Sequence, residues 1–249
     1  MNTTLVNFVR NLSFKLGYEI IPFRNLLSPD VSEIAKATRP YTMTSVLRIH
    51  ALCESVRYLI YNKIEGDIVE CGVWRGGSMM AVAFMLSKLQ SESKELWLYD
   101  TYEGMPEPTA LDIEASSGVA AAESLESEGK TKDSLYWAYA SLDDVSSNLQ
   151  LTNYPQGKLH FIKGKVENTI PQNIPDKIAL LRLDTDWYES TKHCMENLFP
   201  RLTQGGVLIL DDYGFWLGAR KAVDEYFASQ SINPLLIPVD GTGRVMIKQ

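Results

Sequence analysis

The chain has few of the residues that build disulfide frameworks or zinc sites. Its 249 residues include three cysteines and three histidines, with no CxxC pair and no histidine at metal-ligand spacing. We therefore expect Cys53, Cys71 and Cys194 to be buried thiols in a reducing compartment.

Long hydrophobic runs and clusters of positive charge are also missing. No apolar run approaches the roughly 18 residues needed to cross a bilayer, and residues 1–23 are interrupted by Arg10, Lys15 and Glu19. Neither a membrane span nor a secretory signal is expected, so a cytoplasmic location follows by default. The net charge is −7 and no group of Lys and Arg could follow a phosphate backbone, which argues against nucleic acid and favours a small molecule as partner.

What the chain does contain is enough apolar sequence for one large core. With 45% hydrophobic residues, it suits a single α/β domain with additions. Predicted strands alternate with helices, a pattern that indicates a mainly parallel sheet with helices on both faces. The predicted strands cover residues 67–71, 95–99, 158–163, 177–183 and 206–210, and the predicted helices cover 77–89, 188–202 and 218–228, with a further helix starting near Thr44 or Ser45. A hairpin signal over 235–247 completes a seven-stranded, Rossmann-like sheet with an antiparallel C-terminal strand.

Two segments fall outside this alternation. Residues 1–41 are expected to be an N-terminal extension to a domain of residues 42–249. Residues 101–157 separate two strands by far more than the about 2–6 residues that such connections need beyond a helix, so we expect a structural insertion there, with a second helix over 133–149. Because the insertion leaves from the strand edge where ligands bind, a mobile lid is favoured over a plain crossover helix with a surface loop.

Residues 67–78 (DIVECGVWRGGS) predict a strand, a glycine-rich turn and the start of a helix. The spacing is not the GxGxxG of dinucleotide binders, and Glu70 would repel a pyrophosphate, so a cationic or neutral ligand is favoured. Asp100 closes the next strand, where a carboxylate can accept both hydroxyls of a ribose, and S-adenosylmethionine has a ribose and no phosphate. Alternatively, Glu70 and Asp100 cap turns or pair with Arg75. Trp74 either lines the pocket or packs.

Two acidic clusters follow two apolar strands, with Asp184 and Asp186 after one and Asp211 and Asp212 after the other. Carboxylates at neighbouring strand ends are costly to bury alone, so we expect them to gather around a cation. In the absence of imidazole or thiolate, Asp184, Asp211 and Asp212 predict a hard oxygen site for Mg²⁺, with Ca²⁺ or Mn²⁺ as alternatives. Asp186, two residues further along an extended chain, is the candidate general base for a metal-activated hydroxyl.

Other functions fit the acidic pattern less well. Residues 184–186 resemble the DxDx(T/V) nucleophile loop of haloacid-dehalogenase-type phosphatases, but Tyr188 stands where Thr or Val is expected. A nicotinamide oxidoreductase and a non-catalytic binding module of the same fold stay open as alternatives. Aromatic residues flank the acids and form either an acceptor pocket or ordinary packing. They are Trp187, Tyr213, Phe215 and Trp216.

Several motifs in order resemble those of the macrocin, mycinamicin and novobiocin sugar O-methyltransferases. They are Thr42-Met43, the glycine-rich turn, DTYEGMP (100–106), LLRLDTDWYEST (180–191) and GGVLILDDY (205–213). The resemblance, which runs from residue 42 onward, implies a class I methyltransferase fold, S-adenosylmethionine as cofactor and a deoxysugar hydroxyl as acceptor, in enzymes that are generally oligomers. It implies that Asp184, Asp211 and Asp212 hold Mg²⁺ and that Asp186, beside Asp184, is the base.

The resemblance also implies a set of cofactor-binding residues, drawn from four segments. They are Thr42, Met43, Glu70, Gly72, Val73, Trp74, Ser78, Asp100, Thr101, Tyr102, Gly104, Lys163, Gly164 and Val166. The function expected from the sequence is therefore methyl transfer to a hydroxyl of a sugar or glycosylated natural product, by a homo-oligomer that uses S-adenosylmethionine and a divalent metal. A phenol or catechol hydroxyl is the alternative acceptor.

Overall fold

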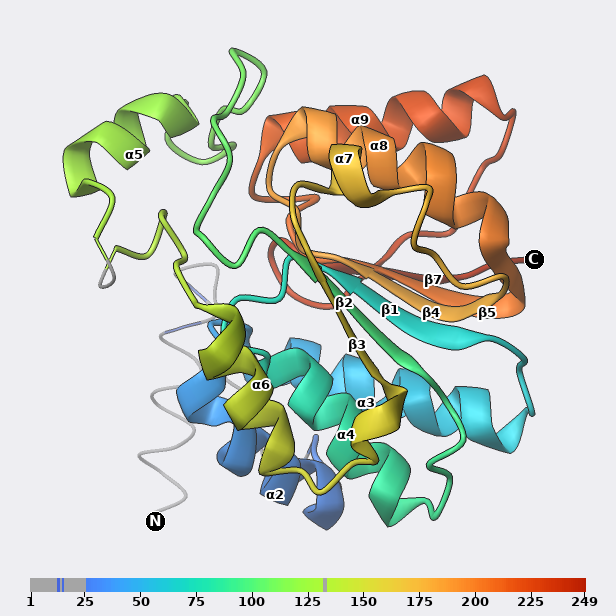
Figure 1. The fold of residues 1–249 in the computed structure, drawn as a ribbon. Helices are drawn as coiled ribbons and strands as arrows, with labels where there is room; N and C mark the ends of the chain where they lie inside the picture. Colours follow the sequence, from blue (N-terminus) through green and yellow to red (C-terminus); the bar gives the residue numbers. More distant parts are fainter. Residues whose placement is uncertain (1–12, 14, 16–25, 132–133) are drawn as a thin grey trace.

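A seven-stranded sheet forms the centre of the molecule in the computed structural model, which describes residues 13, 15, 26–131 and 134–249 (Figure 1). The strand order is β3-β2-β1-β4-β5-β7-β6. The first five strands in this order are parallel, whereas β7 is antiparallel to both β5 and β6. The strands are β1 Asp67–Cys71, β2 Leu96–Asp100, β3 Leu159–Lys163, β4 Ile178–Leu183, β5 Leu202–Leu210, β6 Ile237–Pro238 and β7 Arg244–Ile247. The mainly parallel sheet with an antiparallel end is confirmed.

Helices cover both faces of this sheet (Figure 1). One face carries α2 Pro29–Thr38, α3 Val46–Tyr61, α4 Gly77–Lys88 and α6 Leu142–Gln150, and the other carries α7 Val166–Thr169, α8 Tyr188–Leu198 and α9 Leu217–Ser229. Short 3₁₀ turns lie at Arg39–Tyr41, Gln156–Lys158 and Phe199–Arg201. Helix α5 Ala121–Glu128 stands apart from both layers, beyond the ends of the strands.

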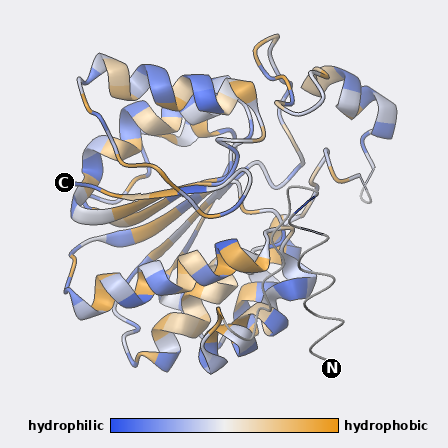
Figure 2. Cartoon of the chain, turned by 180° about the vertical axis from the view of Figure 1, so that it is seen from behind, coloured by the Kyte–Doolittle hydropathy of each residue, from blue (hydrophilic) through white to orange (hydrophobic). Residues whose placement is uncertain are grey.

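Alternate side chains along the strands pack into two hydrophobic cores, one on each face of the sheet. Along β5, Val207 and Ile209 join the core beneath α3 and α4, whereas Leu208 and Leu210 join the core beneath α8 and α9. Since both faces are covered, the central strands are hydrophobic along nearly their whole length, and hydrophilic colour is found mainly on the outer sides of the helices (Figure 2). Burial on both faces holds the carboxyl ends of β1, β2, β4 and β5 in fixed register.

Three predicted element boundaries are wrong by several residues. The helix predicted to end at 202 ends at Leu198, because Pro200 has no N–H and cannot continue it, and β5 begins at Leu202 rather than 206. The helix predicted over 133–149 begins only at Leu142 within the described residues. There the Ser141 hydroxyl accepts a hydrogen bond from the N–H of Asp144 and caps the helix.

The segment before residue 42 contributes to the core where it is described. Val31 and Ile34 of α2 are buried against α4 and α3, while residues 1–12, 14 and 16–25 lie outside the described residues. The division into an extension of residues 1–41 and a domain of residues 42–249 stays a prediction. None of the helices in the described part of the chain combines the length and the apolar character needed to cross a bilayer.

Candidate active site

The site lies where β1, β4 and β5 end side by side. Cys71 pairs with Leu183, and Leu183 with Leu210, so the residues that follow these strands meet at one edge. The chain can turn there because Gly72 has φ +82° and no side chain, and a Cβ at this position would lie 1.8 Å from the carbonyl oxygen of Asp184. Glycine is therefore required for close approach, as the turn motif predicts.

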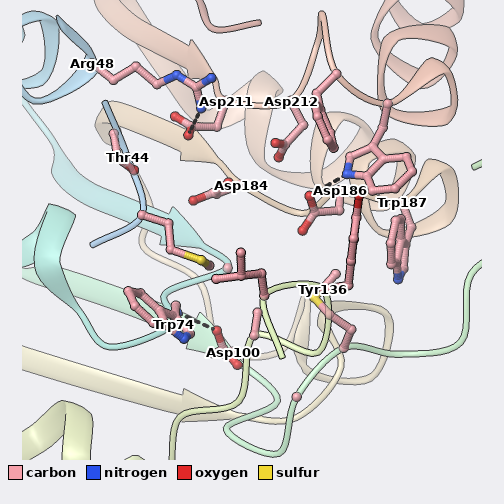
Figure 3. Close-up of a pocket in the computed structure, with 18 of the residues that line it drawn as sticks. Thr44, Arg48, Trp74, Asp100, Tyr136, Asp184, Asp186, Trp187, Asp211 and Asp212 are labelled. Carbon is pink, nitrogen blue, oxygen red and sulfur yellow. Dashed lines mark hydrogen bonds and ion pairs between the residues drawn. The ribbon is translucent and has the colours of Figure 1, made fainter. Parts of the chain in front are cut away.

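A cavity of about 500 Å³ opens at this edge and brings the four predicted aspartates together (Figure 3). Asp184, Asp186, Asp211 and Asp212 all line it, which confirms that the two acidic clusters share a site. Its other walls come from the segment before α3, the glycine-rich turn, the insertion and the loop before α9. They include Met43, Thr44, Arg48, Gly72, Trp74, Asp100, Gly104, Met105, Glu128, Leu135, Tyr136, Ala138, Trp187, Phe215 and Trp216.

Arg182 is a residue of this site that the sequence patterns do not predict. It lies within β4 and is 3% exposed, with its guanidinium 2.9 Å from Asp184 Oδ2 and 2.8 Å from Asp211 Oδ1. It also pairs with Glu70 and donates to the hydroxyl of Thr44. Burial alone would lower the pKa of Arg182, but attraction by the three carboxylates outweighs it and raises that pKa well above its usual value.

Arg48 supplies a second positive charge from α3. Its Nη1 lies 2.5 Å from Asp211 Oδ2, and its Nε lies 2.8 Å from Asp240 Oδ2 in the C-terminal hairpin. Asp211 is thus held by two guanidinium groups, one on each oxygen. The carboxyl groups that line the cavity still outnumber these two guanidinium groups.

Asp186 reaches the cavity through an unusual backbone conformation. Its φ of +57° is left-handed, so the expectation of an extended chain from Asp184 to Asp186 is wrong, although both side chains face the same cavity. The indole N–H of Trp216 donates to Asp186 Oδ1 at 2.8 Å. Burial, followed by repulsion from Asp184, raises the pKa of Asp186 well above the usual carboxyl range.

Asp212 has the least satisfied carboxylate of the four. Its Oδ2 is buried without a hydrogen-bond partner. Burial, followed by repulsion from Asp186 and Asp184, raises the pKa of Asp212 well above its usual value. Even so, in the part of the chain that the structure describes, no three Asp, Glu, His or Cys side chains are grouped closely enough to form a metal-ligand set.

Asp100 organises the glycine-rich turn through its carboxylate. Oδ2 accepts from the backbone N–H groups of Val73 at 2.7 Å and Trp74 at 3.1 Å, and Oδ1 accepts from the N–H of Tyr102 at 2.8 Å. Asp100 also lines the cavity, so it can both brace the turn and face a ligand.

The predicted cofactor residues fall into three groups, according to which of two adjoining pockets, if either, they line. Met43, Gly72, Trp74, Asp100 and Gly104 line the main cavity, and Thr101, Gly164 and Val166 line a smaller adjoining pocket that shares Gly72, Asp100 and Gly104 with it. The remaining predicted residues line neither of these pockets. They are Thr42, Glu70, Val73, Ser78, Tyr102 and Lys163.

Glu70 and Lys163 have other partners. Glu70 is 1% exposed and pairs with Arg182 beneath the cavity rather than with Arg75, whose guanidinium binds Asp144 at 2.8 Å. Lys163 forms a surface ion pair with Glu103 at 2.6 Å. These contacts give Glu70 an electrostatic role beneath the site.

Aromatic rings form the wall opposite the glycine-rich turn. Trp187 and Trp216 meet edge to face with centroids 5.0 Å apart, and Tyr136 and Phe215 each pack against Trp216. Tyr213 does not line the cavity, because its hydroxyl donates to Asp224 on α9. A cavity with acids at one end and aromatic rings at the other suits a polar hydroxyl carried on an apolar ring.

The sheet order, the glycine-rich turn after β1 and the acid after β2 together define a class I methyltransferase fold. The sequence profile of the macrocin-O-methyltransferase (TylF) family matches residues 32–248, so the chain belongs to this O-methyltransferase family.

Two characterised relatives show similar identity. The chain is 31% identical over 211 residues to the 8-demethyl-8-(2,3-dimethoxy-alpha-L-rhamnosyl)-tetracenomycin-C 4'-O-methyltransferase of Streptomyces olivaceus, covering 82% of this chain and 74% of that protein. It is 31% identical over 207 residues to the demethyldecarbamoylnovobiocin O-methyltransferase of Streptomyces niveus, with the same two coverages, 82% and 74%.

Solved structures agree with this assignment. The structure of the O-methyltransferase NovP superposes with a TM-score of 0.71 at 29% identity, covering 84% of this chain and 82% of that one. The calicheamicin methyltransferase CalS11 superposes with a TM-score of 0.61 at 16% identity over 89% of this chain and 93% of its own, a likeness of fold alone.

Proposed function

We propose that this protein transfers a methyl group from S-adenosylmethionine to a hydroxyl of a sugar or glycosylated natural product, with the help of a divalent cation. The observation that carries the proposal is that Asp184, Asp186, Asp211 and Asp212 share one cavity with the glycine-rich turn and Asp100. Family membership supports O-methyl transfer. The names of two relatives, which act on a rhamnosyl tetracenomycin and on a novobiocin precursor, support a glycosylated acceptor.

The turn side of the cavity suits the donor. A sulfonium carries a positive charge, which the excess of carboxylates favours, and the methyl group must face the acids for transfer to occur. The carboxylate of Asp100 faces the same cavity and would accept ribose hydroxyls, while Thr101, Gly164 and Val166 would border the base in the adjoining pocket.

The acids fit a cation in part. The unpartnered Oδ2 of Asp212 and the nearby Asp184 offer hard oxygen ligands, for which Mg²⁺ is the first choice and Ca²⁺ or Mn²⁺ are alternatives. Asp211 can join them only by giving up a contact with Arg48 or Arg182, because both of its oxygens face guanidinium groups. A divalent cation bound there lowers the pKa of a hydroxyl that coordinates it.

Asp186 would take the proton of the acceptor hydroxyl. Its Oδ1 is engaged by Trp216, which leaves Oδ2 to receive the proton. With the proton on Asp186, the acceptor oxygen would be free to take the methyl group that S-adenosylmethionine supplies, and the electrons of the broken carbon–sulfur bond would leave with neutral S-adenosylhomocysteine. The aromatic wall would hold the ring that carries the hydroxyl and exclude water from the reaction.

The substitution Asp186→Asn tests the base, since it keeps the size of the side chain and removes the proton acceptor. We expect kcat to fall by roughly 100-fold or more while S-adenosylhomocysteine binds with unchanged affinity in isothermal titration. The matched control is Asp176→Asn at a fully exposed loop position, which should leave both quantities unchanged. Preserved turnover in Asp186→Asn would reject Asp186 as the base.

An acceptor panel separates the remaining alternatives. Methyl rhamnoside, rhamnosylated polyketides and catechol, each assayed with Mg²⁺ and with EDTA, distinguish a sugar acceptor from a phenolic one and test the metal. Binding of S-adenosylhomocysteine without turnover of any acceptor would favour a non-catalytic module, and binding of NAD instead would favour an oxidoreductase. A cytoplasmic location and a homo-oligomer also belong to the proposal, and light scattering of the purified protein tests the latter.

A further inference from the structure

Within the part of the chain that the structure describes, Trp216 is the side chain that donates a hydrogen bond to Asp186. The backbone of Asp186 is left-handed, at φ +57°, and lies between the end of β4 and the start of α8, so no regular element fixes where the carboxylate points. The contact that does so is the 2.8 Å hydrogen bond from the indole N–H of Trp216 (Figure 3). An indole nitrogen can only donate, so the bond requires an acceptor at this place.

Trp216 is itself held rigidly. It is 2% exposed, its backbone N–H donates to the carbonyl of Asp212 at 3.0 Å, and its ring packs against Trp187, Phe215 and Tyr136. Because both its backbone and its ring are fixed, the indole N–H of Trp216 has one position. It can therefore donate to the Asp186 carboxylate in only one side-chain orientation.

The insertion supplies much of this rigidity. Glu114 forms an antiparallel bridge with Trp216, and on either side of it Ala115 donates to the carbonyl of Phe215 at 2.8 Å while Leu217 donates to the carbonyl of Ile113 at 2.9 Å. These two backbone hydrogen bonds, which form the bridge, attach the insertion to the loop that carries Trp216.

Asp112 anchors the same part of the insertion to α8. It is fully buried, and its Oδ1 accepts from the N–H of Tyr188 at 2.7 Å, the first residue of α8, whose own N-cap residue Trp187 provides no side-chain cap. Its Oδ2 accepts from both the N–H and the hydroxyl of Thr109. The indole of Trp187 donates in turn to the carbonyl of Pro106 at 2.9 Å. The insertion therefore makes hydrogen bonds both to Trp187 and to the loop that carries Trp216.

We propose that Trp216 is a positioning residue for Asp186 and that residues 106–121 act as a fixed buttress that holds it, rather than as a lid. This inference rests on the proposed role of Asp186 as the base. Only the later part of the insertion, which contributes Glu128, Leu135, Tyr136 and Ala138 to the cavity wall, remains available to cover the acceptor. Within the connection of residues 101–157, which the sequence predicts to contain a lid, residues 106–121 then have a different task from the later residues that line the cavity.

The test compares two substitutions that make the same chemical change. Trp216→Phe removes the indole donor to Asp186 and keeps an aromatic ring. Trp97→Phe removes an indole donor to Asp67, 3.3 Å away on β1, far from the cavity. With methyl rhamnoside, or with the glycoside of the panel that turns over best, Trp216→Phe should lower kcat roughly 10- to 100-fold, leaving the acceptor KM and the affinity for S-adenosylhomocysteine within threefold. Trp97→Phe should leave kcat unchanged.

A second measurement needs no acceptor. The indole N–H resonance of Trp216, assigned by its absence from the ¹⁵N spectrum of Trp216→Phe, should shift upfield in Asp186→Ala, while the Trp97 resonance stays in place. An unmoved Trp216 resonance, or a Trp216→Phe variant with kcat within twofold of the parent protein, overturns the inference. If Asp186→Asn is active, the base assignment fails instead; if it is inactive while Trp216→Phe retains kcat, only the positioning role fails.

Discussion

Arg182 is the cation that three of the buried acids share. It binds Glu70, Asp184 and Asp211 at once and is almost fully buried. Arg182→Met keeps the length of the side chain and removes the charge, leaving three carboxylates without their shared cation. We expect a loss of about 3–5 kcal/mol in the free energy of unfolding, measured by urea denaturation at pH 7.

A second substitution that removes one of the uncompensated carboxylates should reverse part of this loss of stability. Glu70→Gln in the Arg182→Met background removes one of the uncompensated charges and should restore part of the stability, whereas Glu70→Gln alone should be destabilising. Equal free energies of unfolding for the parent protein and Arg182→Met would show that the guanidinium of Arg182 does not stabilise the buried carboxylates. The sequence offered a clue to Arg182, because an arginine in an apolar strand is as costly as the aspartates that follow it unless the two are paired.

At the scale of elements, the turn after β1 depends on the absence of a side chain. Gly72→Ala places a Cβ against the carbonyl of Asp184 at a left-handed backbone position, so clash adds to strain. We expect it to cost about 3 kcal/mol or more in the free energy of unfolding. Gly118→Ala is the control, since Gly118 also has φ +74° but nothing within 4 Å, and it should cost only about 1 kcal/mol. Equal losses of stability in the two variants would show that the clash with the Asp184 carbonyl adds nothing to the cost of the positive φ.

Helix α2 is attached to α3 by an ion pair that responds to acid. The neighbouring Ser28 side chain and a 2.8 Å hydrogen bond from Arg57 Nη2 hold the pKa of Asp30 well below its usual range. Since the folded pKa lies below the unfolded pKa of about 3.9, the contribution is present in full above 3.9 and is lost progressively as the pH falls from there through the folded pKa. The pair is partly exposed, so we expect only about 0.5–1 kcal/mol.

Asp30→Asn isolates this contribution. Urea denaturation at pH 6 should show the variant less stable than the parent protein, and at pH 3 the difference should shrink. A difference that stays constant between the two pH values would exclude Asp30 as its source.

At the scale of the whole molecule, sequence patterns predicted the sheet but not the contacts across it. Hydrophobic runs predict the strands from 67–71 to 206–210. The meeting of Asp184 with Asp211 follows because parallel neighbouring strands end at the same edge of the sheet. The partners of these acids could not be predicted in the same way. Arg48 comes from a helix more than 160 positions before Asp211 in the chain, and Trp216, which donates to Asp186, lies on a loop that is hydrogen-bonded to the insertion.

The three cysteines report on the stability of the whole fold. Cys53, Cys71 and Cys194 are all completely buried, as expected from the sequence, and burial raises the pKa of Cys53 to about 12 and that of Cys71 well above its usual value. A buried, protonated thiol reacts only when the structure opens. In native buffer at pH 8 we therefore expect almost no reaction with a thiol reagent such as DTNB, and three equivalents in 6 M guanidinium.

Ligand binding should slow the residual native reaction. Cys71 lies on β1 directly before the turn that would bind the cofactor, so opening of this region is opposed by whatever binds there. At a S-adenosylhomocysteine concentration about 100 times its Kd, stabilisation of about 2.7 kcal/mol should reduce the labelling rate of Cys71 by roughly 100-fold when opening limits exposure. NAD at the same concentration is the control. Labelling of Cys71 in seconds without denaturant, or at a rate that S-adenosylhomocysteine does not change, would contradict either the packing of β1 or the position of the donor.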